Sequence, residues 1–207
     1  MTSEPASGRA ALAEALFRIG AVRFGKFTHA SGRSSSYYLD LRVVPSDPQT
    51  YELAIGAYKA LAEQVGERSF DVVAGVATAG VALSSPLAYL MKKPMVYVRR
   101  EEKGHGLGKR IEGAAQPRWR ALVVDDLATT GGSILSAVDA LRAAGCVVTD
   151  AIVLVDRLEG GKANLAGSGV KLGAFADVKE LVKTLYDQKK VTKRDYEAVL
   201  KQMGEGP

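Results

Sequence analysis

The chain has 207 residues, of which 47% are hydrophobic and 25% are charged, with a formal net charge of +5. This composition predicts a globular protein with a sizeable core, and no apolar run is long enough to span a membrane. The first residues have neither the basic nor the apolar region of a secretory leader, so we expect a cytoplasmic protein with no membrane partner. Cys146 is the only cysteine, which excludes an internal disulfide, and we expect its side chain to be buried.

The positive charge could serve nucleic acid or a small anionic ligand. The sequence contains no arginine-rich tract and no aromatic residues interleaved with basic ones. We therefore expect phosphorylated small molecules as ligands and no nucleic-acid partner.

The first third of the chain predicts a helix, a hairpin and a second helix. Residues 10–19 have the apolar spacing of a helix, and residues 24–42 have the alternation and central turn of a small hairpin. Asp47 and Pro48 form a cap and a first helical residue, which predicts a helix to about Val65. Its expected buried row consists of Leu53, Ala57, Leu61 and Val65.

Four apolar runs then predict buried strands, at residues 72–76, 95–98, 121–124 and 151–155. Helical patterns separate the first run from the second and the third from the fourth. This alternation is typical of an α/β fold with a mostly parallel central sheet flanked by helices. Asp177 with Glu180 predicts the start of a helix through Leu185, and Thr192 predicts the start of a last helix.

The segment 121–133 is the most informative part of the chain. Its apolar run ends in two adjacent acids, Asp125 and Asp126, which a parallel strand would deliver to its carboxyl end. A loop of small residues follows, and then a helical row that ends before Gly145. The members of this row are Ile134, Ala137, Val138, Leu141 and Ala144.

This arrangement suits a sugar phosphate. Backbone N–H groups at the start of the helix attract an anion, and Gly131 and Gly132 allow the backbone to approach it closely. Side-chain hydroxyls are available from Thr129, Thr130 and Ser133. The acid pair can accept hydrogen bonds from a sugar diol or help to hold a hydrated metal ion. An ordinary strand–loop–helix is the alternative, and the double acid disfavours it.

A long polar segment, residues 99–113, connects the second predicted strand to the third. Glycines at 104, 106 and 108 alternate with other residues, and the cations are Arg99, Arg100, Lys103, His105, Lys109 and Arg110. A solvated charged loop is one interpretation. Compact domains rarely keep such a loop without a functional reason, and the predicted phosphate site favours a lid that closes over a pyrophosphate.

Four segments resemble known families. Residues 121–133 are similar to the phosphoribosyl-pyrophosphate (PRPP) signature of type I phosphoribosyltransferases. Three more resemble orotate phosphoribosyltransferases: residues 24–40, which begin Phe-Gly-Lys-Phe; residues 99–106, Arg-Arg-Glu-Glu-Lys-Gly-His-Gly; and residues 156–161, Asp-Arg-Leu-Glu-Gly-Gly. The resemblance covers roughly residues 10–200 and is silent about rates or regulation.

The resemblance implies a type I phosphoribosyltransferase fold in one domain over residues 1–207. Its N-terminal helix and a small hood would occupy about residues 1–45, and its core and C-terminal helices about residues 46–207. The implied reaction transfers the 5-phosphoribosyl group from PRPP to orotate. It releases diphosphate and orotidine 5′-monophosphate, a step in pyrimidine (UMP) biosynthesis.

The resemblance also assigns residues to roles. The catalytic residues would be Lys103, His105, Asp125 and Asp126. PRPP would be bound by these four together with Arg99, Arg100, Leu127, Ala128, Thr129, Thr130, Gly131, Gly132 and Ser133. Orotate would be bound by Thr129, Arg157, Tyr38 and Leu39. Arg157 can offer forked donors to the orotate carboxylate, although an ion pair with Asp156 or Glu159 is the alternative.

Further implications concern partners and cofactors. Mg²⁺ would be held mainly through PRPP, with no certain protein ligand. A homodimer would share its active sites between subunits, and a separate orotidylate decarboxylase could associate with it. Ala30 and Ala79 stand where bacterial members often carry lysines. The alternatives are a phosphoribosyltransferase for another base and a regulator with the same fold.

Overall fold

A computed structural model describes residues 4–28, 34–100 and 110–204 of the chain. The chain divides into two compact units. We call residues 55–175 the core unit, and residues 1–54 with 176–207 the second unit. Each is described by itself, and the expected organisation as one domain over residues 1–207 stays a prediction.

The core unit is built on a six-stranded sheet with the strand order β5-β4-β3-β6-β7-β8. Its strands are β3 (Val72–Val76), β4 (Met95–Val98), β5 (Ile111–Glu112), β6 (Arg120–Ala128), β7 (Val147–Asp156) and β8 (Lys171–Asp177). Strand β3 runs parallel to β4 and β6, and β6 runs parallel to β7, whereas β5 is antiparallel to β4. The predicted α/β fold with a mostly parallel sheet is confirmed.

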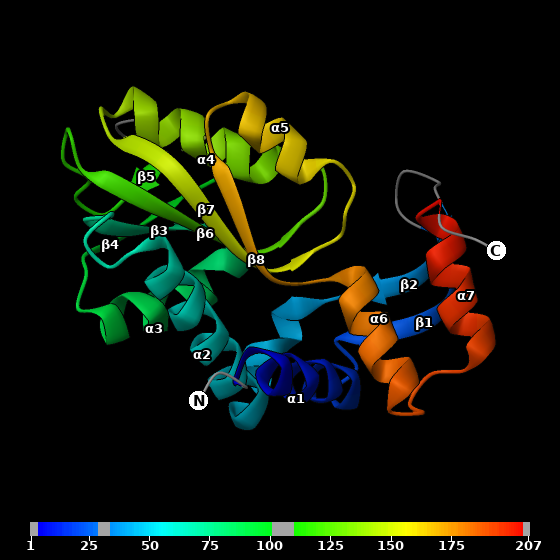
Figure 1. The fold of residues 1–207 in the computed structure, drawn as a ribbon. Helices are drawn as coiled ribbons and strands as arrows, with labels where there is room; N and C mark the ends of the chain where they lie inside the picture. Colours follow the sequence, from blue (N-terminus) through cyan, green and yellow to red (C-terminus); the bar gives the residue numbers. More distant parts are fainter. Residues whose placement is uncertain (1–3, 29–33, 101–109, 205–207) are drawn as a thin grey trace. The chain divides into compact units, whose positions relative to one another are not determined.

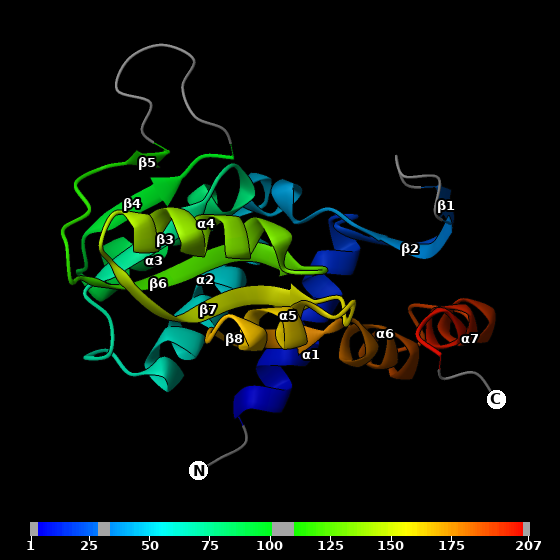
Figure 2. The ribbon, with the colours of Figure 1, turned by 90° about the horizontal axis from the view of Figure 1, so that it is seen from above.

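Helices cover both faces of this sheet. They are α2 (Pro48–Val65), α3 (Ala79–Met91), α4 (Gly132–Ala143) and α5 (Gly161–Gly167). Helices α4 and α5 lie on one face, and α3 with the later part of α2 lies on the other (Figure 1). Figure 2 looks down on the face that α4 covers. Every residue of β3 is buried, because helices remove both faces of the strand from water.

The strand that carries the acids is longer than predicted. It continues past Val124 to Ala128, so Asp125 and Asp126 lie inside the strand and not at its end. The reason is the neighbouring strand: β7 pairs with β6 as far as Ala128, whereas β3 pairs with it only as far as Val124. Beyond Val124, β6 therefore has a strand partner on one side only within the described residues.

Several other details differ from expectation. On α2, Ala57 and Leu61 of the predicted row are buried, but Leu53 is 39% exposed and Val65 is half-buried, and the buried face also includes Tyr58. On α4, Ile134, Ala137, Val138 and Leu141 are buried as predicted, but Ala144 is the exposed C-cap residue. Helix α5 and strands β5 and β8 were not predicted.

The second unit contains the expected hairpin. Strands β1 (Val22–Thr28) and β2 (Ser34–Leu39) pair antiparallel, and the turn predicted around Ser31–Arg33 lies outside the described residues. The unit also contains α1 (Glu4–Arg18), the 3-10 helix η1 (Leu41–Ser46), α6 (Val178–Asp187) and α7 (Lys193–Gln202). Asp177 and Glu180 form the predicted capping box of α6.

Two further expectations can be compared with the structure. Cys146 is a free, buried cysteine just before β7, as predicted. Among the helices in the described part of the chain, none combines the length and the apolar character that crossing a membrane requires.

Candidate active site

The acid pair lies where β6 extends beyond β3. Asp125 is 7% exposed, and its carboxylate Oδ1 accepts a hydrogen bond of 3.0 Å from the backbone N–H of Asp126. The Oδ1 of Asp126 in turn accepts one of 2.9 Å from the N–H of Leu127. Each carboxylate thus has its orientation fixed by the backbone N–H of the residue that follows it.

The electrostatics of this pair are unusual. Burial and the negative charge of Asp126 raise the pKa of Asp125 well above that of an ordinary aspartate, while the charge of Arg100 opposes this rise. A buried carboxylate is costly unless a cation or donors arrive to compensate it. The acid pair thus favours a ligand that brings hydroxyl donors or positive charge.

A buried tyrosine that the sequence gave no reason to single out supports the acid pair. Tyr58 of α2 is fully buried, and its hydroxyl donates a hydrogen bond of 2.7 Å to the backbone carbonyl of Asp125. Burial raises the pKa of Tyr58 well above its ordinary value, and the charges of Asp126 and Asp125 raise it further. Tyr58 therefore stays a neutral donor. The row of buried residues predicted for α2 did not include it.

The start of α3 lies directly against the acid strand. A Cβ atom at Gly80 would come within 2.5 Å of the carbonyl oxygen of Val124 and 3.2 Å of Asp125 Oδ1. Only glycine permits this approach without displacing the helix. Ala77 and Thr78 connect β3 to α3, and Ala79 is the first residue of the helix.

The predicted phosphate loop follows the acids. Gly131 is the N-cap of α4 with a φ of 81°, a left-handed conformation that favours glycine, and the helix begins at Gly132. Gly131 is buried, whereas Thr130, Gly132 and Ser133 are exposed. The first N–H groups of a helix have no partner inside it, so this helix start can accept an anion from solvent.

Arg157 follows β7 in the same unit. Its backbone N–H donates to the carbonyl of Ala128 at 2.9 Å, which places it beside the phosphate loop. Its side chain is 12% exposed, and its Nη2 forms an ion pair with Glu159 Oε1 at 2.9 Å. The ion-pair alternative left open by the sequence is therefore present, and orotate binding by Arg157 stays a prediction.

Only the two ends of the cationic segment 99–113 lie within the described residues. Arg99 forms an ion pair with Glu112 of β5 at 3.2 Å, and its N–H donates to the carbonyl of Arg110 at 2.8 Å. Arg110 also donates to Ser136 of α4 at 2.7 Å. These contacts join the ends of the segment to the sheet and to α4. The predicted residues Lys103 and His105, like Ala30, lie outside the described residues.

The predicted base-contacting pair belongs to β2 in the second unit. Leu39 is buried on the same strand face as Tyr37, whose side chain is 1% exposed. Tyr38 points to the other face, where its ring packs against Phe27 at 5.6 Å and against the Arg23 guanidinium at 5.1 Å. Each of these side chains thus has a packing role within its own unit, and the predicted contact with a base is not tested.

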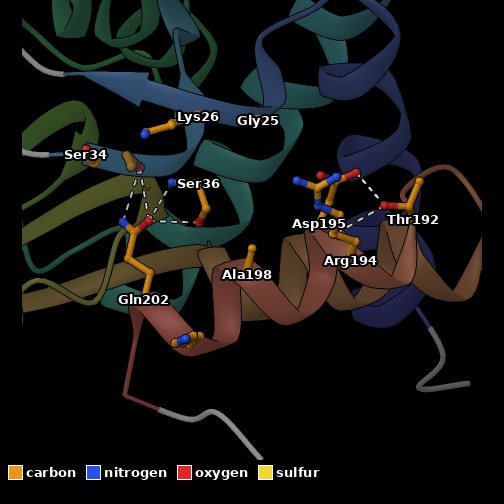
Figure 3. Close-up of a pocket in the computed structure, with 11 residues that line it drawn as sticks. Gly25, Lys26, Ser34, Ser36, Thr192, Arg194, Asp195, Ala198 and Gln202 are labelled. Atoms are coloured by element: carbon orange, nitrogen blue, oxygen red, sulfur yellow. Dashed lines mark hydrogen bonds between the residues drawn. The ribbon is translucent and has the colours of Figure 1, made fainter.

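The second unit also has a groove of its own. It has a volume of about 760 Å³ and lies between the hairpin and α7 (Figure 3). Gln202 of α7 accepts hydrogen bonds from the backbone N–H and the hydroxyl of Ser36 at its rim. The lining residues include Lys26, Arg194 and Lys201, and none of them is a residue predicted for the active site.

The donor set at the acid pair can be tested against a metal ion. Carboxylate oxygens are the ligands that Mg²⁺ prefers, and Asp125 and Asp126 supply two of them. Within residues 4–28, 34–100 and 110–204, no group of three or more acidic, histidine or cysteine side chains gathers as a metal site. The pair fits a hydrated ion that substrate oxygens help to hold.

Comparisons with known proteins now identify the family. Residues 47–169 match the model of the phosphoribosyl transferase domain. An orotate phosphoribosyltransferase of Cenarchaeum symbiosum is 44% identical over 168 residues, which cover 81% of this chain and 84% of that relative.

Solved structures agree. The crystal structure of orotate phosphoribosyltransferase from Aeropyrum pernix matches with a TM-score of 0.78 and 42% identity, covering 84% of this chain and 98% of that one. The structure of Leishmania donovani UMP synthase matches with a TM-score of 0.85 and 33% identity over 95% of this chain. This chain spans 42% of the length of that protein. On the combined strength of the domain match and these relatives, the chain belongs to the orotate phosphoribosyltransferase family.

Proposed function

We propose that this protein transfers the 5-phosphoribosyl group from PRPP to orotate, giving orotidine 5′-monophosphate and diphosphate. The observation that carries this proposal is the acid pair on a parallel strand that leads, through a glycine N-cap, into the start of α4. In a member of this family, that arrangement offers carboxylates to the ribose hydroxyls and backbone N–H groups to the 5′-phosphate.

Bond breaking at the anomeric carbon of the ribose builds positive charge on the sugar and negative charge on the departing diphosphate. Asp125 and Asp126 accept hydrogen bonds from the ribose hydroxyls and stabilise the positive charge. The raised pKa of Asp125 supports this role, because a buried carboxylate gains most from a neighbouring positive charge. No covalent intermediate with the protein is needed.

The diphosphate is neutralised by cations of the segment 99–113: Arg99, Arg100, Lys103 and His105. Arg100 is near enough to the acid pair for its charge to lower the pKa of Asp125, against the larger effect of burial. Mg²⁺ would be held mainly through PRPP, and it would supply further positive charge at the diphosphate. Thr129 to Ser133 bind the 5′-phosphate.

Orotate differs from other bases in carrying a carboxylate, and Arg157 is the proposed partner for it. The guanidinium is mostly buried and already engages a carboxylate, Glu159, which shows that its surroundings accommodate an anion. Thr129, Tyr38 and Leu39 complete the base site by family resemblance alone.

The assay that tests this function offers orotate, uracil, adenine and hypoxanthine side by side with PRPP and Mg²⁺. We expect orotate to be consumed, with stoichiometric diphosphate release, and the other three bases to remain. If a purine is consumed and orotate is not, the acceptor is that purine and the proposed substrate is wrong. If no base is consumed, the proposal is overturned.

We further propose a homodimer in which the cationic segment of one subunit serves the active site of its partner, as the family resemblance of residues 99–106 implies. Lys103→Ala subunits and Asp125→Asn/Asp126→Asn subunits are each expected to be nearly inactive. Mixing them should restore activity, because one site of each hybrid dimer is built from two unmutated parts.

Subunit exchange is verified in this experiment with differently tagged chains, and Lys171→Ala, at an exposed lysine at the start of β8, is the charge-matched control. Verified exchange without recovered activity would show that the segment serves its own chain. A separate orotidylate decarboxylase, which would consume the product, is the enzyme that we expect to associate with this dimer. Co-purification of the two enzymes would support that association, and separate elution would contradict it.

A further inference from the structure

The phosphate loop is supported by a segment to which no part in phosphate binding has been assigned. Three successive carbonyl oxygens of the loop face residues 157–164. The carbonyl of Ala128 accepts from the backbone N–H of Arg157 at 2.9 Å. The carbonyl of Thr130 accepts from the side-chain Nδ2 of Asn164 at 2.9 Å. All of these residues belong to the core unit.

Between these two hydrogen bonds, the backbones touch. A Cβ atom built on Gly161 would lie 2.6 Å from the carbonyl oxygen of Thr129 and 3.3 Å from the nitrogen of Gly131. Real Cβ atoms do not approach backbone oxygens so closely, so residue 161 must be glycine for the loop to lie where it does. The close backbone contact therefore explains why the second residue of the Gly-Gly pair in the segment 156–161 is glycine.

The hydrogen bond from Asn164 has a specific consequence for the loop. A peptide unit is planar and its C=O and N–H point in opposite directions. Fixing the carbonyl of Thr130 thus fixes the plane of the Thr130–Gly131 peptide, immediately before the left-handed N-cap of α4. A rotation of this plane would turn a carbonyl oxygen toward a site that must receive an anion.

We propose that Asn164 is a positioning residue for 5′-phosphate binding: with Gly161, it holds the carbonyls of residues 129 and 130 on one side of the loop, so that the helix start presents donors to the phosphate. This inference rests on the proposed function. It adds that α5, through Gly161 and Asn164, increases the affinity for the sugar phosphate without touching it.

The test compares Asn164→Ala and Asn164→Asp with the control Ala166→Asn. Residue 166 is exposed and lies two positions further along α5, nearly opposite residue 164 on the helix, so the control adds the same amide where it cannot reach the loop. The probes are ribose 5-phosphate and inorganic pyrophosphate, with binding measured by calorimetry.

Loss of one hydrogen bond at an exposed position should weaken ribose 5-phosphate binding about three- to tenfold in Asn164→Ala. Asn164→Asp should lose more, because its carboxylate would face a carbonyl oxygen. Pyrophosphate affinity should not change. In turnover, the KM for PRPP should rise by a similar factor, with kcat and the KM for orotate unchanged, because the 5′-phosphate is bound equally in the ground and transition states.

The outcomes separate the two proposals. If the unmutated protein consumes orotate but Asn164→Ala binds ribose 5-phosphate as tightly as the control, the role of Asn164 is overturned. A lower melting temperature together with a rise of both KM values would show a merely structural role, and it would also overturn the role of Asn164. If the unmutated protein binds ribose 5-phosphate with the expected dependence on Asn164 but consumes no base, only the proposed function fails. An unmutated protein that neither consumes a base nor binds ribose 5-phosphate would overturn both.

Discussion

The acid pair and two of the three arginines that we expect to bind substrate, Arg99 and Arg157, lie in the same unit but are held in different ways. The acids are fixed by the backbone of their own strand and by the hydroxyl of Tyr58. The arginines form ion pairs through their side-chain tips, Arg99 with Glu112 and Arg157 with Glu159. The acid pair therefore has its geometry before substrate binds. The arginines must exchange or share their glutamate partners when they bind an anion.

The two arginines differ from each other in exposure. The side chain of Arg157 is 12% exposed and that of Arg99 is 40% exposed. Ion pairs exposed to water contribute little free energy. When an ion pair is buried, removing either partner is costly, because it leaves the other charge uncompensated. We therefore expect changes at Arg157 to matter far more than changes around Arg99.

The largest effect should come from the preformed region. Replacing both Asp125 and Asp126 with Asn keeps their size but removes the negative charge that stabilises the sugar cation, so kcat should fall about 100-fold or more. Asp139→Asn, at an exposed position of α4, is the matched control and should retain full turnover. Circular dichroism checks that the fold is intact, and near-normal kcat in the double variant would remove the acids from the mechanism.

The second-largest effect should distinguish binding of the base from binding of the sugar phosphate. Arg157→Ala should raise the KM for orotate about 30-fold or more, because a buried charge partner is worth several kcal/mol, and should leave the KM for PRPP nearly unchanged. Arg157→Lys should recover part of the loss, since it keeps the charge but not the forked donors. Steady-state kinetics with each substrate varied in turn measures both constants. An equal rise in the two would mean that Arg157 serves the structure through Glu159.

A small effect is expected at the exposed ion pair. Glu112→Gln removes the carboxylate that holds Arg99, and a pair this exposed contributes about 0–1 kcal/mol. The KM for PRPP should therefore change by no more than about threefold, and raising the salt concentration should erase the difference. A tenfold change would contradict the comparison, since Arg99 would then depend on its glutamate as a buried arginine does.

The smallest effect concerns stability and pH. The pKa of Asp125 is raised above its ordinary value of 3.8, chiefly by burial and then by the charge of Asp126. Its ionised form therefore costs stability above the raised pKa, and this cost disappears as the pH falls through that pKa toward 3.8. Asp125→Asn should melt at a higher temperature than the unmutated protein at neutral pH, by a margin that shrinks on acidification. A margin that grows on acidification would mean that the site stabilises the carboxylate.

Much of the fold could be predicted because its signals are local. The strands at 72–76 and 95–98 and the helix from Pro48 to Val65 have the bounds that apolar runs and a capping pair indicate. Strand β6 was predicted too short because two charged residues normally end a strand. Here the pairing with β7 overrides that preference. Helix α5 is short and made mostly of small residues, so it has little amphipathic pattern to recognise.

The site was predictable in part for the same reason. The acids, the phosphate loop and Arg157 stand in short contiguous motifs. Tyr58 and Asn164 act from other segments, and their hydrogen bonds to Asp125 and Thr130 join residues 67 and 34 positions apart. No local pattern indicates such contacts, because they depend on how helices settle on the sheet.

The close approach of α3 to the acid strand has a consequence for efforts to change the substrate range by directed evolution. Gly80 would place any side chain within 2.5 Å of the Val124 carbonyl. In a library randomised at position 80, most variants would therefore have α3 displaced from the acid strand, whatever residues form their base pocket. Keeping residue 80 constant while varying the surroundings of Arg157 concentrates the library on variants that can still hold the sugar.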